Sequence, residues 1–268
     1  MPAPRSKASA TPAIVLKDVG KHYARGTVAL QGVSFEVGAH AFVSLLGPSG
    51  CGKSTVLRLV AGLDTPSSGL IDSPALADTT VHPAAETAFV FQDPTLMPWA
   101  SVFDNVWLPL RLSGWSRTAA APDVCRILKS VGLSGFEAAF PAELSGGMRM
   151  RASIARALVT RPRVLLMDEP FAALDEITRQ RLNADLLAWW QSSTLAVLFV
   201  THSVHEAVFL SERVLVMGAR PGRVVAEVVI DEPMPRTPEF RASLRYAKAC
   251  GEISQALAAA CIPDGIGE

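Results

Sequence analysis

The sequence predicts an α/β fold that is built around a parallel sheet, and three observations support this prediction. Residues 164–167 and 195–200 are uninterrupted apolar runs, which is typical of central parallel strands that are covered on both faces. A helical pattern over 179–190 separates these two runs, as a crossover helix would. Earlier in the chain, an apolar strand at 41–46 leads through a glycine-rich loop into a helix at 54–61.

The N-terminal third of the chain divides into a tail and a β-rich region. Residues 1–13 are rich in Ala, Pro and Ser, and we expect this tail to be disordered. From 14 to 90, short runs of β-branched residues alternate with turns around the strand–loop–helix unit. We therefore expect ordered structure to begin at Ile14.

A helical region and a C-terminal extension complete the predicted organisation. From about 94 to 160, prolines divide short helical segments such as 123–131 and 147–159. The β/α pattern then returns and continues to about 230. Three prolines between 233 and 238 mark a boundary, and we expect the extension at 231–268 to contain a short amphipathic helix.

The composition excludes several classes of protein. The 268 residues include 25 Lys and Arg and 25 Asp and Glu, so the formal net charge is zero. With 49% hydrophobic and 19% charged residues, the chain is neither a disordered protein nor a coiled coil. A neutral chain also lacks the basic surplus of a protein that binds nucleic acid electrostatically, so we expect no nucleic-acid partner.

The cysteines and the apolar stretches predict a protein without disulfides and without membrane spans. Cys51, Cys125, Cys250 and Cys261 are far apart, which argues against a disulfide framework or a zinc site and for a reducing compartment. The longest apolar stretch, 186–200, is interrupted by polar residues and falls short of the roughly 18 residues that a spanning helix needs. The mean hydropathy of +0.28 fits either a large aliphatic core or docking against an apolar partner.

A phosphate-binding loop is the strongest motif in the chain. Its residues match the pattern G-x-x-x-x-G-K-[ST] between an apolar strand and a helix: Gly47, Pro48, Ser49, Gly50, Cys51, Gly52, Lys53, Ser54 and Thr55. The glycines let the backbone curl so that its N–H groups point at phosphate oxygens, and the positive end of the helix adds to this field. We expect Lys53 to reach the β- and γ-phosphates of ATP and the Ser54 hydroxyl to bind Mg²⁺.

Two acidic residues follow the apolar run at 164–167. Asp168 ends this predicted strand, where doubly wound folds hold their ligands, and we expect it in the Mg²⁺ shell. Glu169 is the next residue, so its side chain points in a different direction from that of Asp168. We predict that it polarises a water molecule for attack on the γ-phosphate. Taken alone, a strand followed by an acidic helix cap would explain the pair equally well, but the phosphate-binding loop favours the catalytic interpretation.

Further motifs lead to a family resemblance. The segment 144–158 resembles the signature motif of ATP-binding cassette (ABC) ATPases. Gln92 resembles the Q-loop residue of that family, Asp175 its D-loop residue, and His202 its H-loop residue. Tyr23 stands at the place of the aromatic residue that stacks on adenine in the family.

The resemblance covers about 14–230 and implies a fold and a set of roles. The implied fold is a P-loop NTPase (RecA-like) core with an N-terminal antiparallel β subdomain and an inserted α-helical signature subdomain. By the family pattern, Gln92 and His202 act beside Glu169 in catalysis, and Gln92 also contacts Mg²⁺. The nucleotide contacts implied outside the phosphate-binding loop are Tyr23, Ser145, Gly146, Gly147, Met148 and Asp175.

The signature motif also implies a dimer. In the family this motif binds the γ-phosphate held by the opposite subunit, and each motif occurs once in this chain. Two complete sites therefore need two chains, most economically a head-to-tail homodimer with a two-fold axis. Met148 and Met150 stand where Gln is commoner in the family. Because the phosphate contacts come mainly from Ser145 and backbone N–H groups, we expect hydrolysis to survive.

Finer features resemble the cassettes of nitrate, sulfonate and taurine importers. These features are the segments 92–99, 104–106 and 220–224. The resemblance implies an ATPase on the cytoplasmic face of the membrane that drives separate integral-membrane permease subunits. A periplasmic or extracellular solute-binding protein would deliver the small solute to that permease.

Two other classes of protein compete with the transporter interpretation. A soluble ABC ATPase could act on a macromolecular machine such as a ribosome, but such proteins usually carry two cassettes or long coiled-coil insertions. A P-loop kinase would need an acceptor site and would leave the segment 144–148, Asp175 and His202 unexplained.

Overall fold

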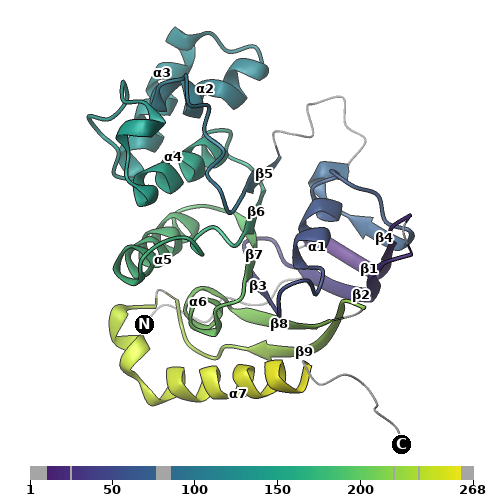
Figure 1. The fold of residues 1–268 in the computed structure, drawn as a ribbon. Coiled ribbons are helices and arrows are strands. Elements are labelled where there is room, and N and C mark those ends of the chain that lie inside the picture. Colours follow the sequence, from purple (N-terminus) through teal and green to yellow (C-terminus); the bar gives the residue numbers. More distant parts are fainter. Residues whose placement is uncertain (1–10, 25, 77–85, 220, 235, 261–268) are drawn as a thin grey trace, which may run out of the picture.

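The computed structural model describes residues 11–24, 26–76, 86–219, 221–234 and 236–260. Most of the tail expected at 1–13, Arg220 and the end of the expected extension therefore lie outside the described residues. Two sheets and a set of helices make up the described part of the chain (Figure 1). None of the helices in this part is long and apolar enough to cross a membrane.

The central sheet is parallel except at one edge. Its strands are β3 (Phe42–Leu46), β5 (Thr87–Val90), β6 (Val164–Asp168), β7 (Ala196–Thr201), β8 (Arg213–Gly218) and β9 (Arg223–Val229). Within the described residues they lie in the order β5-β6-β7-β3-β8-β9, and β9 alone runs antiparallel to its neighbour. The carboxyl ends of β3, β6 and β7 therefore meet at one edge of the sheet, which is where ligands bind in such folds.

Alternate side chains of the central strands enter two apolar clusters. The helices that cover the sheet are α1 (Lys53–Val60), α5 (Glu176–Gln191), α6 (Val204–Leu210) and α7 (Leu244–Ala260). Along β6, Leu165 and Met167 pack into one cluster with α5, α6 and α7. Leu166 packs into the other cluster, with α1 and the smaller sheet. Because both faces are covered, these strands are apolar throughout, as the sequence predicts.

The smaller sheet is antiparallel and lies on the α1 side of the central sheet (Figure 1). Its middle strand β1 (Ile14–His22) pairs with β2 (Val28–Val37) and with β4 (Ser68–Asp72). Ile14, Leu16 and Val19 of β1 are fully or almost fully buried against the second apolar cluster. This packing joins the small sheet to the face of the central sheet that α1 covers.

The helices between β5 and β6 form a separate unit with its own apolar cluster. They are α2 (Val102–Leu112), α3 (Arg117–Ser130) and α4 (Gly146–Leu158), and they lie at the top of Figure 1. Helix α3 begins well before the start predicted at 123, so that prediction was wrong at this end. The Ser116 hydroxyl oxygen accepts the Ala119 N–H at 3.2 Å and caps the first turn, and Pro122 lies inside the helix.

The C-terminal extension packs on the core. Helix α7 runs along β8 and α6, and Phe240, Tyr246 and Ile253 belong to the same apolar cluster as α5 and α6. This helix has 17 residues and is longer than the short amphipathic helix that the sequence predicts. Short 3₁₀ turns lie at Pro74–Leu76, Pro141–Glu143 and Pro238–Ala242.

Candidate active site

The phosphate-binding loop joins β3 to α1 through glycines with unusual backbone angles. Gly50 has a φ of 79° and Gly52 a φ of 95°, which side chains rarely allow. A Cβ atom on Gly47 would lie 2.7 Å from the Met217 carbonyl oxygen, so this position also needs glycine. Gly52 precedes α1 and has no side chain that could cap it, which leaves the positive end of the helix open to an anion.

Lys53 is folded back over this loop. Its Nζ atom donates hydrogen bonds to the carbonyl oxygens of Gly47 at 2.8 Å and Pro48 at 3.0 Å. The same atom lies 3.7 Å from Oε1 of Glu169, and the lysine side chain is only 5% exposed. A buried ammonium group is costly without such partners, so the loop and the carboxylate together hold a positive charge at the pocket.

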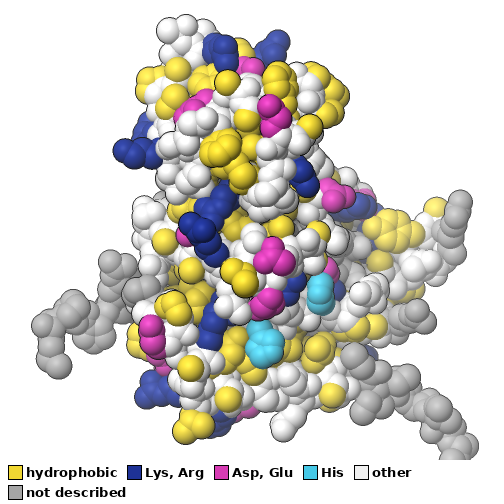
Figure 2. Space-filling model, turned by 60° about the vertical axis from the view of Figure 1, so that its left-hand side comes forward, with side chains coloured by type: hydrophobic (Ala, Val, Ile, Leu, Met, Phe, Trp, Pro, Cys, Tyr) yellow, Lys and Arg dark blue, Asp and Glu magenta, His cyan; other side chains and the backbone are white. Residues whose placement is uncertain are grey.

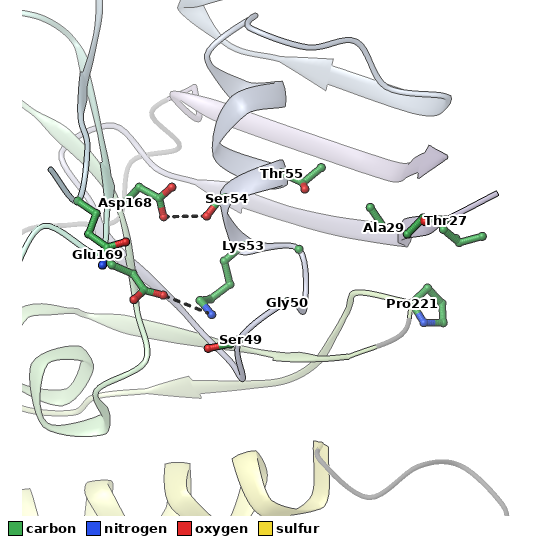
Figure 3. A pocket seen from close by; sticks show the side chains of 13 residues that line it. Thr27, Ala29, Ser49, Gly50, Lys53, Ser54, Thr55, Asp168, Glu169 and Pro221 are labelled. Carbon is green, nitrogen blue, oxygen red and sulfur yellow. Dashed lines mark hydrogen bonds and ion pairs between the residues drawn. The ribbon is translucent and has the colours of Figure 1, made fainter. Parts of the chain in front are cut away.

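Asp168 lies at the end of β6, opposite Ser54. The Ser54 hydroxyl donates to Oδ1 of Asp168 at 3.0 Å (Figure 3). Burial raises the pKa of the Asp168 carboxyl; the hydrogen bond from Ser54 acts against this rise, and the charge of Glu169 adds to it. Gln92 lines the same pocket. Hydroxyl, carboxylate and amide oxygens are ligands that suit Mg²⁺, so this set of side chains fits that ion.

Glu169 follows directly and has a left-handed backbone. Its φ is 45°, a conformation that costs a residue other than glycine about 1–3 kcal/mol. Its N–H donates to the Val200 carbonyl oxygen at 3.0 Å, which anchors the turn to β7. The carboxylate thereby lies between Lys53 and His202, with Oε2 at 2.8 Å from Nδ1 of His202.

One pocket of about 810 Å³ contains most of these groups. In Figure 3 the two acidic residues and Lys53 lie at one end, and Thr27, Ala29 and Pro221 lie at the other. The predicted site residues that line the pocket are Ser49, Gly50, Gly52, Lys53, Ser54, Thr55, Gln92, Asp168 and Glu169. The loop, the acidic residues and the Q-loop residue are therefore brought together.

Other predicted site residues do not line this pocket. Gly47, Pro48 and Cys51 belong to the loop itself, and the Cys51 side chain is fully buried. Tyr23 lies beside Asp64, and its hydroxyl donates to the Asp64 carboxylate at 3.4 Å. The stacking of Tyr23 on adenine stays a prediction.

The signature motif and the D-loop residue lie side by side, and neither lines the pocket. Ser145 caps α4, because its hydroxyl oxygen accepts the Met148 N–H at 3.3 Å. A Cβ atom on Gly147 would lie 2.7 Å from Cγ2 of Thr178 in α5. Asp175 caps α5 and accepts the Thr178 N–H at 2.9 Å; its hydrogen bonds with Thr178 hold the pKa of its carboxyl below the usual range.

The face that α4, α5 and α6 form is chemically mixed. Figure 2 shows apolar, basic and acidic side chains interspersed over it, with histidines near the acidic ones. The His202 side chain is 58% exposed.

The far wall of the pocket contains residues that the sequence analysis did not predict. They are the segment 27–29 and Pro221. Gly222 ties these parts together, because its N–H donates to the Ala29 carbonyl at 3.0 Å. A Cβ atom on Gly222 would lie 2.2 Å from the Cys51 carbonyl oxygen, so the chain after β8 touches the phosphate-binding loop. The proline–glycine pair is the available sequence signal, but its contact depends on the fold.

Comparisons with known proteins agree with this geometry. A family model described as "ABC transporter" matches residues 30–172. The chain is 48% identical over 209 residues to a taurine import ATP-binding protein of Rhizobium johnstonii, with 78% of this chain and 79% of that protein covered. It is 44% identical over 246 residues to a nitrate import ATP-binding protein of Synechocystis sp., with 89% and 91% covered.

A solved structure shares the fold. At 30% identity and a TM-score of 0.71, the chain matches the ATP-binding cassette MJ0796, which was solved as a dimer in a post-hydrolysis state bound to ADP and Pi. The match covers 82% of this chain and 100% of that one. The predicted fold class and the predicted ATPase activity are confirmed. The chain belongs to the ABC transporter family of ATP-binding, ATP-hydrolysing proteins.

Proposed function

We propose that this chain is the ATPase subunit of an importer for a small oxyanion of the nitrate, sulfonate or taurine type. The ATPase part of the proposal is carried by the convergence of Lys53, Asp168 and Glu169 at one end of the pocket. The names of two relatives as taurine and nitrate import proteins support the direction of transport and the class of solute.

The protein acts in this proposal as one part of a larger assembly. It lies on the cytoplasmic face of the membrane and drives separate permease subunits. A periplasmic or extracellular solute-binding protein supplies the solute to that permease and does not touch this chain. The similarity to import ATP-binding proteins over most of the chain supports this arrangement.

The shape of the pocket supports one orientation of ATP. The triphosphate lies along the loop at 47–55, where Lys53 and the open end of α1 attract the β- and γ-phosphates. The ribose and base then extend toward Thr27 and Pro221 at the other end. Tyr23 is the residue that we propose to stack on adenine.

Ser54, Asp168 and Gln92 would hold Mg²⁺ in this site. Their support is the 3.0 Å contact between the Ser54 hydroxyl and Asp168, and the place of Gln92 in the same pocket. When bound, the ion neutralises negative charge on the β- and γ-phosphates. The carboxyl group of Asp168 is partly buried, and a nearby cation offsets the cost of that burial.

Glu169 is placed to act as the general base. Its carboxylate accepts a proton from the water molecule that attacks the γ-phosphate, while the bond between the γ-phosphorus and the bridging oxygen breaks. His202, at 2.8 Å, orients this carboxylate and presents its exposed ring to the γ-phosphate. Lys53 balances the negative charge that gathers at the phosphates.

A second copy of the chain completes the site in this proposal. Five residues would act on the nucleotide that the second copy holds, and none of them lines the pocket of its own chain. They are Ser145, Gly146, Gly147, Met148 and Asp175. The dimeric state of the solved relative supports a homodimer. We propose an ATPase domain at 14–230 with the helical unit inserted at about 94–160, a tail at 1–13 and an extension at 231–268.

Affinity capture tests the transporter role. Tagged Glu169→Gln protein is recovered with ATP and Mg²⁺ from membranes of the source organism, and its partners are identified by mass spectrometry. We expect a permease with several membrane spans, which an identical preparation without the tagged chain does not yield. If only soluble partners such as ribosomal proteins appear while membrane proteins are recovered, the soluble alternative is correct.

A further inference from the structure

Helix α6 carries a buried carboxylate that the proposed mechanism does not use. The Glu206 side chain is 7% exposed, and its Oε2 accepts a hydrogen bond from the Thr201 hydroxyl at 2.5 Å. Within the described part of the chain, its Oε1 has no hydrogen-bond partner but lies 3.8 Å from Nε of Arg179. Burial raises the pKa of Glu206, while Thr201 and the charge of Arg179 act against the rise. A buried carboxylate is costly unless such partners hold it.

Arg179 connects this carboxylate to the segment between β6 and α5. Its Nη2 donates to the Leu174 carbonyl at 2.7 Å, and its Nε donates to the Phe171 carbonyl at 3.3 Å. The segment begins with Glu169 and ends with Asp175. One guanidinium group thus holds the backbone between the proposed general base and the residue that we place at the dimer contact.

Thr201 connects the same carboxylate to the residue that contacts the general base. Its hydroxyl donates to Glu206 and accepts the Ser203 N–H at 3.0 Å. His202 lies between these two bonded residues, and its Nδ1 is 2.8 Å from Glu169. The two hydrogen bonds therefore fix the backbone on both sides of His202.

We propose that Arg179 and Glu206 act as a positioning pair for ATP hydrolysis. The pair holds the segments that carry Glu169 and His202 at a fixed separation, and it does so from behind the pocket without touching the nucleotide. It also connects Asp175, at the proposed dimer contact, to the segment that carries His202. Docking of the second copy at Asp175 therefore changes the position of His202. This inference rests on the proposed function of the pocket.

Steady-state ATP hydrolysis by the full chain tests the pair. Glu206→Gln keeps the size of the side chain and an acceptor for Thr201, but removes the buried charge that faces Arg179. The exposed carboxylate of Glu176, 3.2 Å from Nη1 of Arg179, is left in place. We expect kcat to fall about tenfold and the KM for ATP to stay within about twofold, because misplaced reacting groups slow chemistry more than binding. A role in packing alone would leave kcat unchanged, since Gln has nearly the same shape.

A matched control and a double variant separate the pair from general effects. Glu212→Gln also removes a partly buried carboxylate, one that accepts the Phe42 N–H at 3.2 Å, and should keep the wild-type kcat. Arg179→Lys should lower kcat as Glu206→Gln does, and the double variant should be no slower than the slower single variant. Losses that multiply in the double variant, or a kcat for Glu206→Gln equal to that of the control, overturn the proposal.

The remaining outcomes are also decisive. If Glu206→Gln does not fold, as judged by thermal unfolding, then Arg179→Lys decides alone, and an unchanged kcat in that variant overturns the pair. A wild-type chain that does not hydrolyse ATP would instead overturn the proposed function. The two failures are therefore distinguishable.

Discussion

The Nδ1 atom of His202 lies 2.8 Å from Oε2 of Glu169, although 33 positions separate the two residues in the chain. The parallel strands β6 and β7 bring them together, because Asp168 pairs with Val200 at the carboxyl end of the sheet. The contact between base and imidazole therefore depends on the register of two buried strands, and a shift of one residue would separate the pair.

Removal of the general base should stop turnover while ATP still binds. Glu169→Gln removes the proton acceptor but keeps the size of the side chain, so kcat should fall by about 10²- to 10⁴-fold and an ATP-bound dimer should accumulate. Phosphate release and size-exclusion chromatography measure these effects. Glu252→Gln, an exposed change on α7, should behave as the wild type. Hydrolysis by Glu169→Gln at the wild-type rate would show that another group accepts the proton.

Removal of the Lys53 ammonium should weaken ATP binding. A hydrogen bond to a charged group contributes about 1.5–3 kcal/mol, so Lys53→Ala should raise the Kd for ATP by about 10- to 150-fold. Isothermal titration calorimetry measures this change. Lys248→Ala, which removes an exposed ammonium on α7, is the matched control and should leave Kd unchanged. Equal affinities in the two variants would refute the phosphate-binding role of Lys53.

A bulky charge in the signature motif should block hydrolysis without blocking binding. Ser145 caps α4 and does not line the pocket of its own chain, so Ser145→Arg should leave the Kd for ATP within about twofold. The arginine obstructs the neighbouring copy's site, and kcat should fall at least about 10²-fold. Calorimetry and phosphate release separate the two effects. Full activity in a protein that sedimentation shows to be monomeric would contradict the shared site.

A side chain at Gly222 should destabilise the fold around the phosphate-binding loop. A Cβ atom there would lie 2.2 Å from the Cys51 carbonyl oxygen, so Gly222→Val forces the backbone apart and should cost about 1–3 kcal/mol of unfolding free energy. Thermal unfolding measures the loss. Gly251→Ala in α7 adds a Cβ atom with nothing within 4 Å, and should be neutral or slightly stabilising. Equal melting temperatures for the two variants would argue against the close contact.

The central strands could be predicted from the sequence because burial on both faces leaves a clear pattern. Strands β6 and β7 cover nearly the same residues as the predicted runs at 164–167 and 195–200. The phosphate-binding loop could be located for a similar reason, since its glycines are required by local geometry at Gly50 and Gly52. Local rules succeed where a residue's role is set by its immediate neighbours in the chain.

The helical unit was harder to predict because prolines that are expected to divide its helices lie inside them. Pro109 lies inside α2 and Pro122 inside α3. The true starts are at the capping serines Ser101 and Ser116, whose hydroxyl oxygens accept backbone N–H groups three residues later. Tertiary packing against the third apolar cluster then stabilises helices that propensity alone would interrupt.

Contacts between distant segments that belong to no recognised motif could not be predicted. The approach of Gly222 to the loop and the contact of Arg179 with Glu206 join residues whose spacing follows no local period. Both depend on which strands and helices become neighbours in the sheet. The sequence marks Gly222 as part of the segment 220–224 but gives no sign of its contact with the loop. Arg179 and Glu206 read in the sequence as two ordinary charged residues of helices.

The packing of Phe240, Tyr246 and Ile253 against the main apolar cluster limits how this chain can be cut or recombined. A version shortened at Ile230 would lose the helix that runs along β8 and α6 and would bare the apolar surface beneath it. Exposed patches of this kind promote aggregation. Chimeric proteins made from this chain must therefore transplant the last helix together with the sheet that it covers.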